Sequence, residues 1–324
     1  MMKLGKKVCV LGGAGFVGRA AVPALTEAGY EVTVAVRRVE RYRELALIPG
    51  VRLVGLKNIT SDALVSLFNS HDTVINLYAD QSNRTECVEE ESFVSVTQTI
   101  KKAAEQLGVA RLIQLSQIGA NASQAKSNWL RVLGEADSII HNMASSKTTI
   151  LRAGLLIGEG DNTTRLYKAQ LARFPIMMVA NADRQIQPLW VKDFARALVV
   201  AIKSPSCFNA KVEVAGEERM SVMDLAEWVS GFMGLESAKL IPMCQANAKF
   251  MLWLGWLAPF KTLDAYQQKQ LAVDLTSQQD FSSQFGFEPT NIESILSSYV
   301  VPHKIRQRYE FFRVHAGRKS SEFK

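Results

Sequence analysis

The chain has 324 residues, 48% of them hydrophobic and 21% charged, and its formal net charge is +7. This composition excludes a disordered or fibrous protein, and the length suits about two folding units with cores of their own. The four cysteines are scattered without a Cys-x-x-Cys pair, and the four histidines do not cluster with them. We therefore expect neither a disulfide framework nor a structural zinc site.

Short apolar runs alternate with helical spacing through the first half of the chain. The pattern predicts strands at 7–11, 31–36, 51–54, 73–77, 111–116 and 148–151, and helices at 18–28, 40–47, 62–69, 91–107 and 128–144. Alternating strands and helices favour right-handed crossovers and a parallel sheet covered on both faces. The predicted fold class is α/β, a doubly wound parallel sheet of the Rossmann type.

The second half lacks this rhythm. It predicts helices at 164–172 and 193–202, a strand at 212–215, and a further helix capped by the hydroxyl of Ser221. We expect a smaller, partly interleaved C-terminal α/β domain. The predicted division gives 1–160 to the dinucleotide-binding domain with 186–203 returning to it, 161–185 and 204–300 to the smaller substrate or partner domain, and 301–324 to a basic tail.

A glycine-rich loop between the first predicted strand and the first predicted helix is the strongest local signal. Glycines in this setting permit a tight turn, let the backbone approach a pyrophosphate, and let the helix pack on the strand. The free amides of the helix start then attract the phosphates. The cofactor-binding residues predicted here are Gly12, Gly13, Ala14, Gly15, Phe16, Val17 and Gly18.

The end of the second strand indicates which dinucleotide binds. An NAD-binding chain places an acidic residue about 20 residues past the loop, against the ribose hydroxyls. This chain has Arg37 and Arg38 there, with Arg41 and Arg43 beyond. Arginine suits a 2′-phosphate through charge-assisted hydrogen bonds, so we predict NADP(H) as the cofactor. A solvated basic turn is the alternative.

Further cofactor contacts are expected at the carboxyl ends of later strands, where doubly wound folds bind their ligands. The fourth strand runs into Leu77, Tyr78 and Ala79, and the fifth ends near Ser116. The third strand ends at residues 55–58, close to the expected adenine. Three other residues have plainer interpretations. They are Arg152 as a core salt bridge, Asp193 as a structural helix-start residue, and Trp190 as either core or pocket lid.

The glycine loop, the strand rhythm and the stretch PLWVKD at 188–193 resemble the extended short-chain dehydrogenase/reductase superfamily. The closer likeness is to its atypical branch, which contains the NADPH-binding accessory subunit of respiratory complex I and its bacterial relatives. Supporting stretches are LSQIGA at 115–120, WLR at 129–131 followed by GE at 134–135, LR at 151–152 through IG at 157–158, and FGFEPT at 285–290. The resemblance covers most of residues 7–298.

The resemblance implies a catalytic tyrosine and lysine four residues apart on the helix after the fifth strand, with a serine or threonine that orients the substrate. The matching positions hold Trp129 and Leu133, and Gln117 follows Ser116. Indole is not a useful acid at neutral pH and leucine carries no charge, so we predict no catalytic residues. A displaced acid, either Tyr78 or Tyr167 with the neighbouring lysine, is the alternative.

Charge and apolar residues near the C-terminus bear on partners. Residues 303–324 hold seven Lys and Arg against two Glu, and the apolar stretch 251–260 lies between two lysines. We expect a membrane surface or a protein complex as partner rather than nucleic acid; a solvated basic end is the alternative. No signal peptide or run of ~18 apolar residues is seen. The expected location is cytoplasmic, with peripheral attachment to the cytoplasmic face of a membrane.

The resulting hypothesis is an NADP(H)-binding, non-catalytic protein related to short-chain dehydrogenases. Its role would be structural or regulatory at a membrane redox assembly, such as respiratory complex I or one of quinone metabolism. Two alternatives stay open. One is an NADPH-dependent reductase or epimerase with an atypical active site, and the other is a soluble NADPH-sensing regulator.

Overall fold

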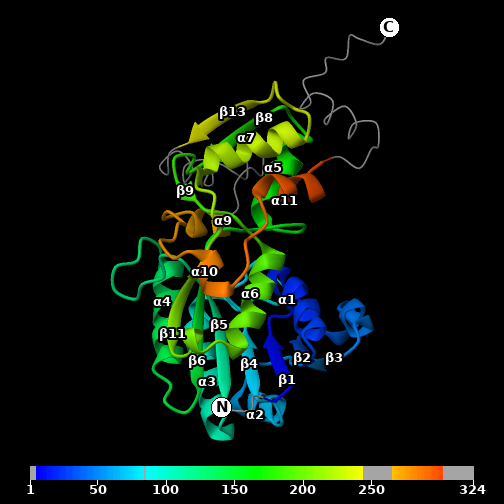
Figure 1. The fold of residues 1–324 in the computed structure, drawn as a ribbon, viewed down its shortest axis with the longest axis vertical. Helices are drawn as coiled ribbons and strands as arrows, with labels where there is room; N and C mark the ends of the chain where they lie inside the picture. The colour runs from blue at the N-terminus through cyan, green and yellow to red at the C-terminus, as the bar shows by residue number, and fades with distance from the viewer. Residues whose placement is uncertain (1–4, 84, 244–264, 302–324) are drawn as a thin grey trace.

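The computed structural model describes residues 5–83, 85–243 and 265–301 (Figure 1). Seven strands form one sheet in the order β11-β6-β5-β4-β1-β2-β3, and every neighbouring pair is parallel. The chain winds outward from β1 to β3 and then crosses back to β4, as in a Rossmann fold. The predicted fold class is confirmed. The strands are β1 (Lys7–Leu11), β2 (Glu31–Val36), β3 (Val51–Gly55), β4 (Thr73–Asn76), β5 (Arg111–Gln117), β6 (Lys147–Ala153) and β11 (Ala210–Val214).

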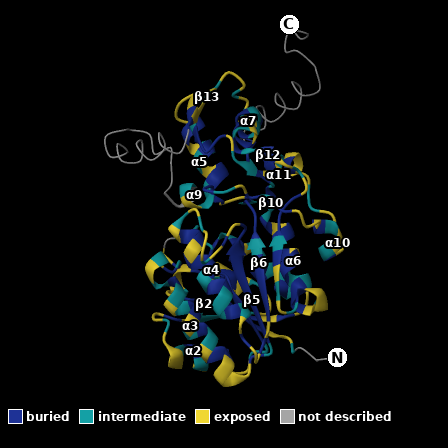
Figure 2. Ribbon diagram, turned by 90° about the vertical axis from the view of Figure 1, so that its left-hand side faces the viewer, coloured by how far each residue is buried: buried dark blue, intermediate teal, exposed yellow. Residues whose placement is uncertain are grey.

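Helices cover both faces of this sheet, because its central strands are apolar on both sides. All seven residues of β5 are buried (Figure 2). On one face α1 packs against α6, and on the other α3 contacts both α2 and α4. These helices are α1 (Phe16–Glu27), α2 (Ser61–Phe68), α3 (Glu90–Leu107), α4 (Asn128–His141) and α6 (Val191–Lys203).

One predicted helix differs in the structure, and the end of another is confirmed. The stretch 40–47 was expected to be helical, but it forms two short 3₁₀ turns, η1 (Val39–Arg41) and η2 (Arg43–Leu47). These turns connect β2 to β3. The long helix α3 ends where expected, because Gly108 adopts a left-handed φ of 63° and caps it.

The sheet takes in more of the second half than the predicted division allowed. We expected residues 204–300 to belong to the smaller domain, yet β11 pairs with β6 as the seventh strand. The helix α10 (Phe281–Phe285) also returns, and its two phenylalanines lie in the same core as the sheet. The chain therefore crosses between the two parts repeatedly, and the 3₁₀ turn η3 (Pro205–Cys207) leads into β11.

The smaller part lies beyond the carboxyl edge of the sheet and has an apolar core of its own (Figure 1). Its helix α7 begins at Ser221, which forms a capping box with Asp224, so this predicted cap is confirmed. The smaller part also contains three two-stranded sheets. The elements are β7 (Leu156–Ile157) with β10 (Leu189–Trp190), β9 (Gln185–Ile186) with β12 (Met220–Ser221), β8 (Ile176–Ala180) with β13 (Lys239–Met243), and the helices α5 (Asn162–Leu171), α7 (Val222–Phe232), α9 (Ala265–Gln270) and α11 (Ile292–Tyr299).

Two predicted features fall outside the described residues: the apolar stretch 251–260, and the basic tail apart from its first residue, Val301. Within the described ranges, no helix has the length and apolar character needed to cross a membrane.

Candidate functional site

The glycine loop joins β1 to α1 at the carboxyl edge of the sheet. Gly12 has a φ of +75°, and a Cβ there would lie 3.0 Å from the carbonyl carbon of Leu77. A Cβ on Gly18 would lie 2.4 Å from the Cα of Gly13, so the helix and the loop touch through their backbones. Both contacts require glycine. The loop thus has the turn and the close helix packing that the sequence predicted.

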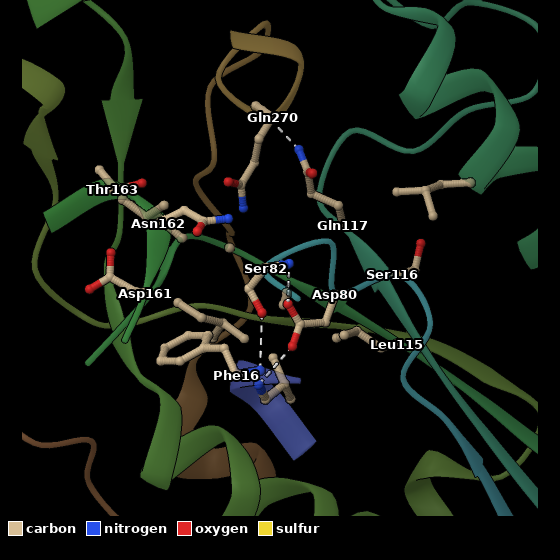
Figure 3. A pocket seen from close by; sticks show the side chains of 17 residues that line it. Phe16, Asp80, Ser82, Leu115, Ser116, Gln117, Asp161, Asn162, Thr163 and Gln270 are labelled. Atoms are coloured by element: carbon tan, nitrogen blue, oxygen red, sulfur yellow. Dashed lines mark hydrogen bonds between the residues drawn. The ribbon is translucent and has the colours of Figure 1, made fainter. Parts of the chain in front are cut away.

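The start of α1 is where the structure adds residues that the sequence analysis missed. The Phe16 N–H donates to Ser82 Oγ at 3.0 Å, and the Val17 N–H donates to Asp80 Oδ2 at 2.8 Å (Figure 3). A Cβ on Gly15 would lie 2.5 Å from the same carboxylate oxygen. The space that Gly15 leaves by lacking a Cβ is therefore occupied by the Asp80 carboxylate, from the loop after β4. Desolvation raises the pKa of Asp80.

At the other end of the site, the carboxyl ends of β2 and β3 open into a groove. It is lined by Arg37 and Arg38 from the first strand and by residues 55–58 from the second. Arg38 and Lys57 are exposed there, whereas the Arg37 guanidinium donates to two carbonyls of the loop after β4. Exposed cations at this position suit a ribose phosphate, whose oxygens accept charge-assisted hydrogen bonds.

A cavity continues past the start of α1, between the sheet edge and the smaller part (Figure 3). Of the residues predicted to face the cofactor, Phe16, Val17, Ala79 and Ser116 line it. Leu77 and Tyr78 are instead buried in the core, where Leu77 supports the glycine turn. The smaller part and the strand ends add polar side chains that the sequence analysis did not single out: Gln117, Asp161, Asn162, Thr163 and Gln270.

The helix α4 carries the positions of the catalytic pair. Leu133 lines the cavity, whereas Trp129 is 2% exposed and packs edge-to-face on Phe93 of α3, with ring centroids 5.3 Å apart. One turn after Leu133, Asp137 pairs with Arg152 at 2.9 Å, so the core salt bridge predicted for this arginine is confirmed. The helix surface that faces the cavity therefore offers a hydrocarbon in place of a cation.

Both carboxylates of the cavity wall are held at helix starts. Asp80 bonds α1 as described, and Asp161 caps α5, where it accepts the Thr164 N–H at 2.7 Å and lies 3.3 Å from the Tyr299 hydroxyl. Burial raises the pKa of Asp161. Among the described lining residues there is no tyrosine, lysine, histidine or cysteine. No proton donor of the usual dehydrogenase type faces the cavity from that part of the chain.

The displaced acids considered above are also accounted for. Tyr167 is buried in the core of the smaller part, and its neighbour Lys168 donates to the Tyr299 carbonyl at 2.6 Å. Burial raises the pKa of Tyr78, and this residue does not line the cavity. Neither tyrosine is therefore placed to act on a ligand in the cavity.

Two residues near the start of α6 have structural roles. We expected Asp193 to be structural by bonding a helix start. It is structural, but its carboxylate instead accepts the Thr290 N–H at 2.7 Å and pairs with Arg196 at 3.3 Å. It thereby fixes the loop before α11 against the sheet. Trp190 is half-buried, packs against both cores and has Lys192 4.9 Å from its ring centroid. It joins the two parts of the molecule and is not among the residues that line the cavity.

The groove, the glycine loop and the cavity lie in one line along the sheet edge. Glycines 12, 15 and 18 leave space that a Cβ would fill, and the exposed cations stand at one end. This arrangement fits a dinucleotide: Arg38 and Lys57 would hold its ribose phosphate, the start of α1 its pyrophosphate, and the cavity its nicotinamide half. When bound, the nicotinamide supplies a hydride donor or acceptor.

Known proteins show the same pattern. The chain is 22% identical over 301 residues to the mitochondrial NADH dehydrogenase (ubiquinone) 1 alpha subcomplex subunit 9 of Mus musculus, covering 88% of this chain and 77% of that protein. The corresponding protein of Rattus norvegicus is 23% identical over 305 residues, with the same shares covered.

Solved structures show the same fold at low identity. A nucleoside-diphosphate-sugar epimerase from Staphylococcus aureus has a TM-score of 0.70 and 18% identity, covering 90% of this chain and 99% of that one. A dTDP-glucose 4,6-dehydratase from Streptomyces venezuelae, solved with NAD, has a TM-score of 0.71 and 15% identity, covering 96% and 98%. The NAD(P)H-binding family matches residues 12–183, more than half of the chain. The protein therefore belongs to the NAD(P)H-binding family.

Proposed function

We propose that this protein binds NADP(H) without catalysing hydride transfer, and that it has a structural or regulatory role at a membrane redox assembly. The observation that carries the proposal is on α4. Leu133 faces the cavity where a cationic partner of the nicotinamide ribose is needed, and Trp129 is packed on Phe93. A general acid must reach the reacting atom within about 3 Å, and neither side chain has a proton to give there.

The preference for the phosphorylated dinucleotide is supported by the groove at the ends of β2 and β3. Arg37, Arg38 and Lys57 line it and are all exposed. A dianionic 2′-phosphate would gain charge-assisted hydrogen bonds that a ribose hydroxyl cannot make. Glu40 is the one acidic residue among the described residues that line the groove.

Attachment to a membrane surface is supported by an apolar patch on β8 and β13. Three of the large apolar side chains exposed in the described chain gather there, namely Phe174, Ile176 and Ile241. Arg173 and Lys239 lie beside them and are also exposed. An apolar surface flanked by cations suits an anionic lipid headgroup layer. The strand β13 ends at residue 243, directly before the stretch that holds the tryptophan-rich residues 251–260.

The proposed assembly is one that handles electrons at a membrane. The relatives from mouse and rat are named as subunits of NADH dehydrogenase (ubiquinone), and this chain covers most of their length. A subunit of such a complex can use a bound dinucleotide to stabilise its fold or to signal cofactor supply, without turning the cofactor over.

Titration calorimetry together with a turnover assay tests the proposal. We expect binding of NADPH in preference to NADH, and no consumption of NADPH with carbonyl compounds or nucleotide sugars. Turnover faster than about 1 s⁻¹, the low end of ordinary enzyme rates, would contradict it. The variant Trp129→Tyr with Leu133→Lys restores the usual pair and serves as the comparison for residual activity.

A reductase or epimerase with an atypical site is the second candidate. The carboxamides of Gln117, Asn162 and Gln270 reach the cavity and offer both donors and acceptors to a small polar substrate. The turnover assay separates the two candidates, since only this one requires NADPH consumption or isomer interconversion. The soluble NADPH-sensing regulator is separated from the membrane-bound role by the vesicle experiment described in the Discussion.

A further inference from the structure

The segment that follows β4 folds back over the glycine loop and the end of β2. We call residues 80–83 and 85–87 the covering segment. At its start, the Asp80 carboxylate takes the Val17 N–H at 2.8 Å and also accepts the Ser82 N–H at 2.9 Å. A negative charge is thus placed at the positive end of the α1 dipole, where it is favourable.

A second contact of the covering segment occupies another N–H group of the helix start. Ser82 Oγ accepts the Phe16 N–H at 3.0 Å (Figure 3). Asn83 Nδ2 donates to the Ala14 carbonyl at 3.2 Å. The first two N–H groups of α1 therefore have partners from this segment. A dinucleotide pyrophosphate binds at such helix-start N–H groups.

The same segment reaches the ribose end of the site. The buried Glu86 accepts the Arg37 N–H through Oε2 at 2.9 Å. The Arg37 guanidinium donates to the Cys87 carbonyl at 3.0 Å and to the Thr85 carbonyl at 3.3 Å. A carboxylate thus stands at the end of β2, and one of the two arginines expected to bind the cofactor is held by main-chain oxygens.

We propose that the covering segment competes with the dinucleotide, so that cofactor binding displaces it from the start of α1 and the end of β2. The inference rests on the proposed binding of NADP(H). Two anions cannot share the same short helix start, because each N–H donates to one acceptor and the charges repel each other. The Asp80 carboxylate and the pyrophosphate need the same donors, so one must leave.

This exchange gives the protein a way to report cofactor binding. Displacement releases Arg37 for the 2′-phosphate and exposes the covering segment at the surface. Because coupling between two binding events is reciprocal, a partner that binds the displaced segment tightens NADP(H) binding, and a partner that binds the folded segment weakens it.

The affinity for NADPH in neutralised variants tests the competition. Asp80→Asn keeps the shape and one acceptor but removes the charge, and Glu86→Gln does the same at the ribose end. We expect calorimetry to give a dissociation constant roughly tenfold lower for Asp80→Asn and a smaller decrease for Glu86→Gln. Asp280→Asn is the matched control. It alters an equivalent carboxylate cap on α10, which lies outside the site, and its affinity should equal that of the wild type.

An unchanged or weaker affinity in Asp80→Asn overturns the competition while the proposed function stands, provided that the wild type binds NADPH. If neither the wild type nor any variant binds NADPH or NADH, the proposed function fails and the competition fails with it. If only the neutralised variants bind, the competition holds in its strongest form.

Hydrogen exchange on the wild-type protein decides the question without a substitution. With saturating NADPH, we expect amides of residues 80–87 to exchange faster, because the segment has left, while Phe16 and Val17 stay protected by their new acceptor. Slower exchange in residues 80–87 would mean that the segment closes over the cofactor as a lid, and would overturn the proposal.

Discussion

Arg152 of β6 donates through Nε to Oδ2 of Asp137 on α4 at 3.0 Å, and its Nη2 lies 2.9 Å from the same oxygen in an ion pair. The aspartate is fully buried, and Gln114 of β5 also contacts it at 3.4 Å. The pair lies one helical turn beyond Leu133 and fastens α4 to the sheet. This ion pair therefore holds the helix in its place beside the cavity.

Breaking this ion pair should destabilise the fold. Asp137→Ala leaves the arginine without its counter-charge in a mostly buried position, and we expect a loss of about 3–5 kcal/mol in the free energy of unfolding by denaturant titration. The double variant Asp137→Leu with Arg152→Met removes both charges and should recover most of the loss. Glu135→Ala, which breaks an exposed pair with Arg131 on the same helix, should cost less than about 1 kcal/mol. Equal losses for the two single variants would contradict the prediction.

Cofactor preference should depend on Arg38. This side chain is exposed in the groove, and no hydrogen bond to the loop after β4 has to break before it meets a phosphate, unlike that of Arg37. We expect Arg38→Ala to weaken NADPH binding about tenfold to hundredfold, with little change for NADH, because a charge-assisted hydrogen bond is lost. Arg41→Ala, which lies outside the groove lining, is the control. A loss of affinity shared equally by both dinucleotides would argue against a phosphate contact.

The stability that the buried carboxylate of Asp161 contributes at the start of α5 should decrease as pH rises. Burial raises the pKa of Asp161 above its ordinary value of 3.8, so the folded state binds this proton more tightly than the unfolded state. The stability that Asp161 contributes relative to Asp161→Asn is therefore greatest below that value and falls as pH rises through the raised folded-state pKa. Thermal unfolding of both proteins at pH values from about 3.5 to about 7 would measure this difference in stability.

The exposed cap Asp280 provides a control of opposite sign for that experiment. Hydrogen bonds from Ser283 lower the pKa of Asp280. The stability that this carboxylate contributes is present above its unfolded pKa and is lost as pH falls through its folded pKa. Asp161→Asn and Asp280→Asn should thus change the pH profile in opposite directions. A common direction would show that the burial of Asp161 does not dominate its titration.

Attachment to vesicles should require the apolar patch and anionic lipid together. We expect the full chain to float with anionic liposomes at low salt, and to float less at high salt or with neutral lipid. Ile176→Ser and Ile241→Ser should each reduce the bound fraction about fivefold, as expected for the loss of a partly inserted aliphatic side chain. Leu47→Ser, which alters an exposed leucine in η2, should have no effect. Absence of flotation with any lipid would leave protein contacts as the route to an assembly.

The sequence alone determined the sheet, the glycine loop and the helix caps, because these depend on neighbouring residues. Period-two and period-3.6 patterns follow from backbone geometry. Gly18 is required by its contact with Gly13 inside one strand-turn-helix unit, and Gly12 has a positive φ in the same turn. The capping box at Ser221 is likewise contained in four residues. The match of Trp129 and Leu133 to a tyrosine and a lysine came from the family resemblance and not from a local pattern.

Only the tertiary structure decided what those elements meet. Asp80 contacts Val17 across 63 residues, and Asp193 contacts Thr290 across 97. The addition of β11 beside β6 likewise depended on how the chain folds back. Such contacts depend on strand order and on which loops meet at the sheet edge, and no local periodicity carries that information. A carboxylate after β4 looks like any loop aspartate until the fold brings it to the amides where a phosphate would bind.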